Sequence, residues 1–216
     1  MQSDEFKKLT EGKKLCIVTD PPFNIGYHYN EYKDKMTETS YYEMLKKVFT
    51  MYEIPYVVIH YAESLYKIAS YTGNIPEKVV SWVYNSNTGK QHRDIAFFKV
   101  KPDFRKVLQP YKNPNDKRIQ ERISRGITGG RLYDWWNINQ VKNVSKKKIN
   151  HPCVMPLEVM KNIIGILPDD YVIFDPFCGA GTTALACKLL GRSCICCDIN
   201  EDYCNITYDR LITTLC

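Results

Sequence analysis

Short apolar runs and longer amphipathic stretches alternate along the first hundred residues. Each apolar run is rich in Val, Ile and aromatic side chains, which is typical of a buried strand. The stretches between them repeat apolar positions three and four residues apart, which is typical of a helix with one buried face. The pattern predicts strands at residues 15–19, 54–60, 79–84 and 95–100, and helices at residues 40–51 and 63–71. Thr39 or Ser40 is predicted to cap the first of these helices.

The same alternation returns near the end of the chain. It predicts helices at residues 156–166, 182–190 and 201–215, and strands at residues 171–174 and 194–197. Strands that alternate with helices favour an α/β fold, in which helices cover both faces of a mostly parallel sheet. Residues 101–150 have no such period and are dominated by charges, prolines and glycines. We therefore expect one domain in two halves, residues 1–100 and 151–216, with residues 101–150 as an insert.

The insert also carries the net positive charge of the chain. It contains thirteen Lys or Arg against four Asp or Glu, a net charge of +9 in a chain whose total is +6, so the rest sums to −3. A basic segment on a nearly neutral body is the expected footprint of a polyanion-binding surface. A merely solvated, lysine-rich loop is the alternative that charge alone leaves open.

Composition excludes several other classes of protein. No apolar run approaches the roughly 20 residues that span a bilayer. The first eight residues lack the apolar core of a signal peptide, so a cytoplasmic or nuclear compartment and no membrane partner are expected. Nine cysteines, an odd number, argue against a closed disulfide framework. Cys194, Cys196 and Cys197 lie in an apolar run, and we expect them to be buried, reduced and free of metal.

A glycine-containing turn follows the predicted strand at residues 171–174. It begins with Asp175 and contains Gly179 and Gly181, and Asp198 follows the next predicted strand. This order is typical of a nucleotide-binding βαβ unit, in which the second acidic residue binds a ribose diol. Position 184 is alanine rather than a third glycine, and no Gly-Lys-Ser/Thr phosphate loop is present. A nucleoside with a short cationic tail, such as S-adenosylmethionine, fits a turn that begins with a carboxylate. The simpler alternative is a tight turn without a ligand.

A second acidic turn, Asp20-Pro21-Pro22-Phe23, follows the first predicted strand. Two consecutive prolines give a rigid extended turn, because each fixes φ and lacks an N–H. The Asp20 carboxylate and the Pro21 carbonyl can then accept two hydrogen bonds from an exocyclic amine, while Phe23 stacks on the ring. A base in DNA must leave the duplex stack to reach such a site. An ordinary strand-to-loop turn is the alternative.

Taken together, the two turns resemble the amino-methyltransferases of DNA. Asp20-Pro21-Pro22-Phe23 resembles the catalytic motif of that family, and the segment from Phe174 to Thr183 resembles its cofactor loop. The catalytic motif comes first and the cofactor loop last, with a variable basic stretch between them, which resembles the beta class. The resemblance implies a Rossmann-like fold that binds S-adenosylmethionine. It makes residues 1–100 the catalytic half, 101–150 a target-recognition insert and 151–216 the cofactor half.

The resemblance also implies roles for individual residues. Asp20, Pro21, Pro22 and Phe23 would be catalytic. The cofactor would contact Asp175, Phe177, Gly179, Gly181, Thr182 and Asp198, with His151 and Pro152 closing the pocket. Within the insert, DNA contacts are expected from Arg118, Arg122, Arg125 and Arg131. Trp135 and Trp136 are equally compatible with packing and with base contacts.

One departure from the family is visible. Val154 and Met155 stand where the family usually carries Gln-Lys, so any contact by that lysine is absent here. The expected partner is double-stranded DNA, and the small insert leaves room for a homodimer. The expected setting is the cytoplasm, in a bacterial, archaeal or viral context.

The acceptor base is open between two amines. Asp at position 20, with Asn24 following, resembles the adenine-N6 enzymes more than the cytosine-N4 enzymes. An RNA base methyltransferase and a non-catalytic nucleic-acid-binding module remain as alternatives.

Overall fold

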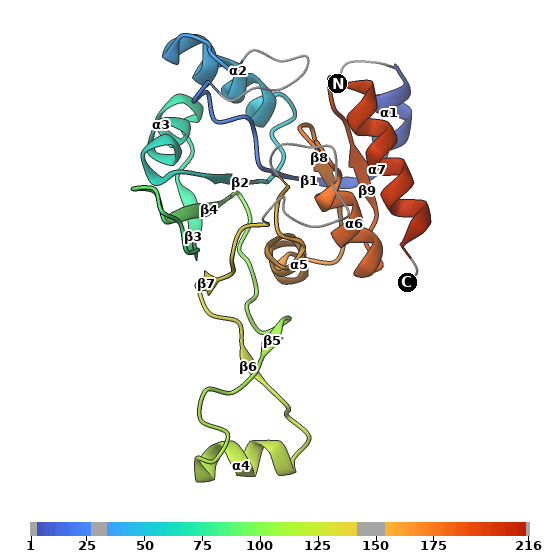
Figure 1. Ribbon diagram of the computed structural model, residues 1–216. Coiled ribbons are helices and arrows are strands. Elements are labelled where there is room, and N and C mark those ends of the chain that lie inside the picture. Colours follow the sequence, from blue (N-terminus) through green and yellow to red (C-terminus); the bar gives the residue numbers. More distant parts are fainter. Residues whose placement is uncertain (1–3, 27–33, 142–153, 215–216) are drawn as a thin grey trace.

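A seven-stranded sheet forms the centre of the computed structural model, which describes residues 4–26, 34–141 and 154–214 (Figure 1). The strand order is β7-β3-β4-β2-β1-β8-β9. The bounds are β1 (Lys14–Thr19), β2 (Tyr56–His60), β3 (Pro76–Val83), β4 (His92–Phe98), β7 (Trp135–Asn137), β8 (Tyr171–Asp175) and β9 (Cys194–Cys196).

The sheet is mostly parallel, as the sequence predicts. Only β4 runs antiparallel to its neighbours, β2 and β3. The reason is local, because the short polar connection from β3 to β4 can close a hairpin but is too short for a parallel crossover. All the other pairings are parallel.

Helices cover both faces of the sheet (Figure 1). Helices α1 (Asp4–Thr10), α2 (Glu38–Thr50) and α3 (Ala62–Thr72) bury side chains such as Leu45 and Ile68 against one face. Helices α5 (Leu157–Ile166) and α6 (Thr182–Leu189) bury Ile163 and Ala186 against the other. Helix α7 (Glu201–Thr213) packs beside α6.

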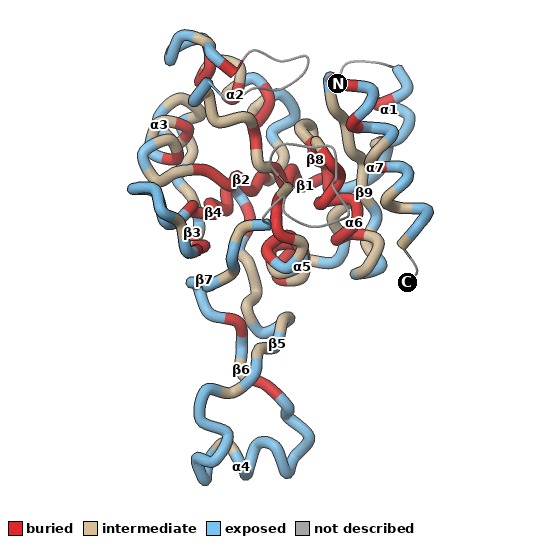
Figure 2. The backbone as a smooth tube through the Cα atoms, viewed as in Figure 1, coloured by how far each residue is buried: buried red, intermediate tan, exposed pale blue. Residues whose placement is uncertain are grey.

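A long arm extends away from the sheet. It holds the two-residue strands β5 (Leu108–Gln109) and β6 (Gly130–Arg131), with helix α4 (Lys117–Ser124) at its tip (Figure 1). No residue of α4 is buried, and most of the arm is exposed (Figure 2). The Asp116 side chain caps α4 by accepting hydrogen bonds from the backbone N–H groups of Arg118 and Ile119.

The structure corrects three details of the sequence analysis. Thr37, not Thr39 or Ser40, caps α2, because its hydroxyl accepts a hydrogen bond from the Ser40 N–H at 3.3 Å. Cys194, Cys196 and Cys197 are half-buried rather than buried, because they lie on or directly after the edge strand β9. The stretch without a period contains α4, and also β7, which joins the central sheet beside β3.

No helix within the described ranges combines the length and the apolar character that crossing a membrane requires. Likewise, no group of His, Cys, Asp or Glu side chains in those ranges is arranged to hold a metal ion.

Candidate active site

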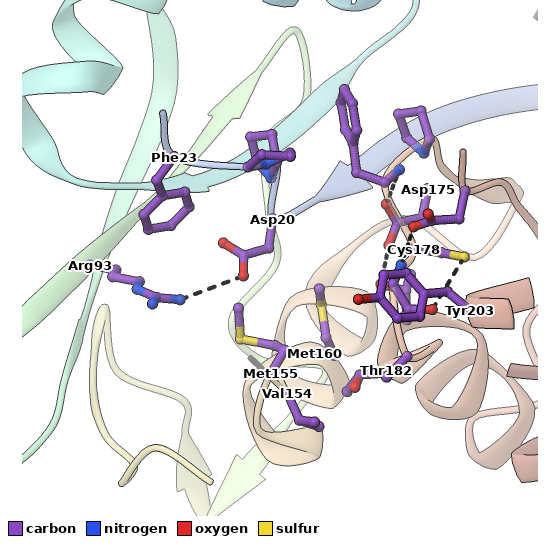
Figure 3. Close-up of a pocket in the computed structure, with 18 of the residues that line it drawn as sticks. Asp20, Phe23, Arg93, Val154, Met155, Met160, Asp175, Cys178, Thr182 and Tyr203 are labelled. Carbon is purple, nitrogen blue, oxygen red and sulfur yellow. Dashed lines mark hydrogen bonds and ion pairs between the residues drawn. The ribbon is translucent and has the colours of Figure 1, made fainter. Parts of the chain in front are cut away.

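The two acidic turns meet at one cavity. Strands β1 and β8 are parallel neighbours, with Ile17 in register with Phe174, so the turns that follow them lie at the same edge of the sheet. The chain leads from β1 to β2 on one side of this pair and from β8 to β9 on the other side. Open α/β sheets bind ligands at the point where the strand order reverses in this way. The cavity there measures about 550 Å³, within the usual range for a small-molecule site (Figure 3).

The structure brings most of the predicted site residues to this cavity. Its lining includes Asp20, Pro21, Pro22, Phe23, Asp175, Phe177, Gly179, Thr182 and Asp198. His151 and Pro152 lie outside the described residues. Val154 and Met155, which replace the family's Gln-Lys, also line the cavity and present apolar side chains to it.

A buried chain of hydrogen bonds holds the turn from Asp20 to Phe23. The Tyr61 N–H donates to His60 Nδ1 at 2.8 Å, so the neutral imidazole carries its proton on Nε2. His60 Nε2 lies 2.9 Å from the Tyr41 hydroxyl, which donates to the Pro22 carbonyl at 2.6 Å. Burial, aided by the nearby Arg93 cation, lowers the pKa of His60 to about 3. The imidazole therefore stays neutral and supports the turn at physiological pH.

Phe23 packs among aromatic and cationic groups. The His60 ring stacks on it with ring centroids 4.2 Å apart and an interplanar angle of 21°. Tyr61 meets it edge-on at 5.0 Å. The guanidinium carbon of Arg93 lies over the same ring, 4.6 Å from its centroid. The ring is thus fixed in place at the cavity wall.

Asp20 is half-buried, and one of its carboxylate oxygens is available to accept a hydrogen bond. Its side chain is 20% exposed, and Oδ2 lies 3.5 Å from Arg93 Nη1 (Figure 3). Oδ1 is buried and, within the described part of the chain, accepts no hydrogen bond. Burial raises the pKa of Asp20 to about 6, with Arg93 opposing that rise and Asp175 adding to it. A buried acceptor without a donor is costly, so this oxygen suits a ligand N–H.

Asp175 organises the second turn from within. Its Oδ1 accepts from the Thr19 hydroxyl at 2.7 Å and from the Phe177 N–H at 3.1 Å, and its Oδ2 accepts from the Thr183 hydroxyl. Burial raises the pKa of Asp175 to about 6, against the effect of these hydrogen bonds. The carboxylate lines the cavity and also ties β1, the turn and α6 together.

Gly179 and Gly181 have different roles. The Gly179 N–H donates to Asp198 Oδ2 at 2.8 Å, so this glycine links the turn to the acidic residue after β9. Gly181 is not among the lining residues. It has a φ of +73°, and a Cβ placed on it would lie 2.4 Å from the Thr207 hydroxyl oxygen on α7. Gly181 therefore permits close packing between the turn and α7.

The acidic and apolar side chains of the lining fit an adenosyl nucleoside with a cationic tail. The Asp198 carboxylate lies where a ribose diol is bound in βαβ units, and the Asp175 carboxylate lies at the mouth of the turn. Phe177 and Pro156 supply apolar surface for a purine ring.

The four arginines predicted to contact DNA lie outside the cavity. Arg118, Arg122 and Arg125 belong to α4 and its C-cap at the arm tip, and Arg131 lies on β6 in the stem. Arg118 and Arg125 pair with Asp116 and Glu121.

The Arg122 Nε–H donates to the Tyr111 hydroxyl at 3.1 Å. Trp136 is buried in the core, whereas Trp135 is 46% exposed and stacks on Tyr133. Packing is therefore the role of Trp136, and Trp135 remains on the surface.

Sequence reasoning missed several residues of the cavity wall. Arg93 and Trp82 come from the β3–β4 hairpin, and Tyr203 comes from α7. The available signal for Arg93 was its place in the polar stretch His92–Asp94, directly before the apolar run Ile95–Phe98 of β4.

Two solved structures have a similar fold. The cytosine-N4-specific PvuII DNA methyltransferase superposes with a TM-score of 0.66 at 15% identity, covering 96% of this chain and 84% of that one. The M1.HpyAVI–SAM complex gives 0.60 at 20% identity, covering 96% and 92%. At 15% and 20% sequence identity, these similarities show that the chains share a fold.

Sequence comparison gives the family. Residues 15–209 match the model of the DNA methylases that covers N6 and N4 enzymes, and the chain belongs to this family. The type II methyltransferase M.HpaI of Haemophilus parainfluenzae is 27% identical over 227 residues, which is 95% of this chain and 70% of that protein. The DNA adenine methyltransferase YhdJ of Escherichia coli strain K12 is 23% identical over 241 residues, or 96% and 79%.

Proposed function

We propose that this protein methylates the exocyclic N6 amine of adenine at a specific sequence in double-stranded DNA, using S-adenosylmethionine and a flipped target base. The observation that carries the proposal is the buried Oδ1 of Asp20 at the cavity wall, which accepts no hydrogen bond from any described residue. Membership of the DNA methylase family supports the reaction class.

The residues of the cavity divide into two groups. Asp175, Phe177, Gly179, Thr182 and Asp198 would hold S-adenosylmethionine, which supplies an electrophilic methyl group on a sulfonium when bound. That sulfonium cation and the α-ammonium group favour the acidic lining of the cavity. Apolar side chains at positions 154 and 155 exclude water from it.

The turn from Asp20 to Phe23 would act on the exocyclic amine of the target base. Asp20 Oδ1 and the Pro21 carbonyl accept its two hydrogen bonds, which orients the nitrogen lone pair toward the methyl group. Phe23 stacks on the base. As the N–C bond forms and the C–S bond breaks, the nitrogen gains positive charge, and Asp20 accepts the proton that it loses. Asp20 must be ionised to do so, and its pKa of about 6 leaves it mostly ionised at neutral pH.

Adenine is favoured over cytosine by two observations. Asp20 and Asn24 resemble the adenine enzymes, and the relative YhdJ is named an adenine methyltransferase. Cytosine N4 is the second candidate, because the cytosine-N4-specific PvuII structure shares the fold with a TM-score of 0.66.

Methyl transfer to unmethylated genomic DNA tests the proposed function, with RNA from the same cells as the control acceptor. Radiolabel from S-adenosylmethionine is expected in the DNA and not in the RNA. Label in RNA alone, or no label despite measured binding of S-adenosylmethionine, would contradict it.

The arm is proposed to contact the DNA backbone through its tip. Replacing Arg118, Arg122 and Arg125 together by alanine is expected to weaken duplex binding by about tenfold or more at low salt. The slope of log affinity against log salt should fall by about 2 to 3, because each lost phosphate contact removes about 0.9. Fluorescence anisotropy across a salt series measures both quantities.

The matched control removes three lysines at the opposite side of the molecule. Lys7, Lys8 and Lys13, on and just after α1, are exposed and far from α4 (Figure 1). Their triple alanine variant should keep the salt slope of the wild type. Equal slopes for the two triple variants would show that the arm tip does not contact phosphates.

A further inference from the structure

One charged side chain in the cavity has no role in the reaction described above. Arg93, on β4, has a side chain that is only 9% exposed. Its guanidinium carbon lies 4.6 Å from the centroid of the Phe23 ring and 5.4 Å from that of Trp82. Its Nη1 lies 3.5 Å from Asp20 Oδ2, and Figure 3 shows the guanidinium pointing at that carboxylate beside Phe23.

The proposed function assigns contacts with Phe23 and with the Asp20 carboxylate to the target base, and Arg93 contacts both. A guanidinium is planar, stacks on aromatic rings and presents N–H donors in its plane. An adenine or a cytosine with its exocyclic amine has the same features. The guanidinium and the base would therefore both stack on the face of Phe23 that Arg93 covers, and the two cannot stack there together. At Asp20 the guanidinium lies at Oδ2, beside the Oδ1 that is assigned to the base amine.

We propose that Arg93 stands in for the target base: in the DNA-free enzyme its guanidinium pairs with Asp20 and covers Phe23, and it gives up both contacts when the flipped base arrives. This inference rests on the proposed function of the cavity. Arg93 is a positioning residue in this scheme, because it acts on the reaction through Asp20.

The charge that develops during methyl transfer requires this departure. The amine nitrogen becomes positive as the N–C bond forms, and a guanidinium kept at Asp20 would repel that charge and compete for the carboxylate. The cation retains partners after it moves, because the Trp82 ring and the Tyr61 ring, 6.0 Å away, also face it.

Burial and two charged groups set the pKa of Asp20 in the free enzyme. Burial raises this pKa, Arg93 from β4 lowers it and Asp175 from β8 raises it further, with a result of about 6. His60 from β2 is neutral in the pH range where Asp20 titrates, because its own pKa lies near 3. Removing the cation at position 93 therefore raises the pKa of Asp20 in the free enzyme.

The test compares the wild type with Arg93→Gln and Arg93→Lys in pH–rate profiles for methyl transfer to DNA. The acid limb of kcat/KM reports the free enzyme, and the acid limb of kcat reports the complex. In Arg93→Gln, we expect the kcat/KM limb to shift upward by about one pH unit. Arg93→Lys keeps the charge and should leave that limb in place. The kcat limb should be the same in all three proteins, because the cation has already left Asp20 in the complex.

A change in the kcat limb of Arg93→Gln that matches its kcat/KM limb would overturn the inference, since Arg93 would then stay at Asp20 throughout. Unchanged limbs in both quantities would overturn it as well. The wild type separates this failure from that of the proposed function, because a wild type that methylates no DNA contradicts the function itself.

A second measurement needs no variant to fold and no turnover. The guanidinium nitrogen resonances of Arg93 in the wild type are followed by NMR as cognate duplex is added in the presence of S-adenosylhomocysteine. They should move as Asp20 is released. Resonances that stay unchanged while the duplex binds would overturn the inference.

Discussion

Replacing Asp20 by alanine is expected to lower kcat for methyl transfer by at least about 10³-fold, because the variant loses the preorganised acceptor for the amine. Binding of S-adenosylmethionine should be largely retained. Asp20 makes no hydrogen bond to the segment from Asp175 to Asp198 among the described residues, so that segment keeps its structure. Single-turnover assays and calorimetric titration with S-adenosylmethionine measure the two quantities.

Two further variants sharpen this result. Asp20→Asn keeps the shape of the side chain but not its charge, and it should also be strongly impaired. Asp170→Ala removes an exposed carboxylate that pairs with Lys14 away from the cavity, and it should keep nearly full activity. Activity that survives in Asp20→Ala would show that the catalytic assignment is wrong.

Replacing Gly181 by alanine is expected to cost about 2–4 kcal/mol of unfolding free energy, the sum of backbone strain and overpacking. The residue has a φ of +73°, and the new Cβ would lie 2.4 Å from the Thr207 hydroxyl oxygen and 2.5 Å from its methyl carbon. Either α7 or the turn must shift, so binding of S-adenosylmethionine should weaken too. Urea denaturation measures the loss of stability.

Gly191 is the matched control for this prediction. It has a similar φ of +63°, but nothing lies within 4 Å of the position of a Cβ. Gly191→Ala should therefore lower the unfolding free energy by only about 1 kcal/mol, the cost of backbone strain at a positive φ. The double variant Gly181→Ala/Thr207→Gly should recover part of the loss. Equal costs at the two glycines would contradict the packing role of Gly181.

The placement of the two acidic turns at one edge of the sheet could be predicted from the sequence. A buried strand followed by an acidic turn specifies which end of the strand faces a ligand, and Asp20 and Asp175 both follow such strands. The alternation of strands and helices then implies a parallel sheet, which places both turns at one edge. The neighbouring positions of β1 and β8 confirm that expectation.

Other features depend on tertiary contacts that no local pattern encodes. Arg93 reaches Asp20 only because the β3–β4 hairpin folds next to β2. Gly181 looks like a ligand-contacting glycine in sequence, yet its neighbour is Thr207, 26 positions away on α7. Helix α4 escapes a search for apolar periodicity because it buries nothing and depends on the Asp116 cap.

The most direct measurement is the identity of the methylated nucleoside. Unmodified genomic DNA is incubated with the protein and tritiated S-adenosylmethionine, then digested, and the nucleosides are resolved by mass spectrometry. The account predicts N6-methyl-2′-deoxyadenosine. N4-methyl-2′-deoxycytidine would contradict the choice of adenine while keeping the mechanism. DNA without any methylated nucleoside, from a protein shown to bind S-adenosylmethionine, would contradict the proposed function as a whole.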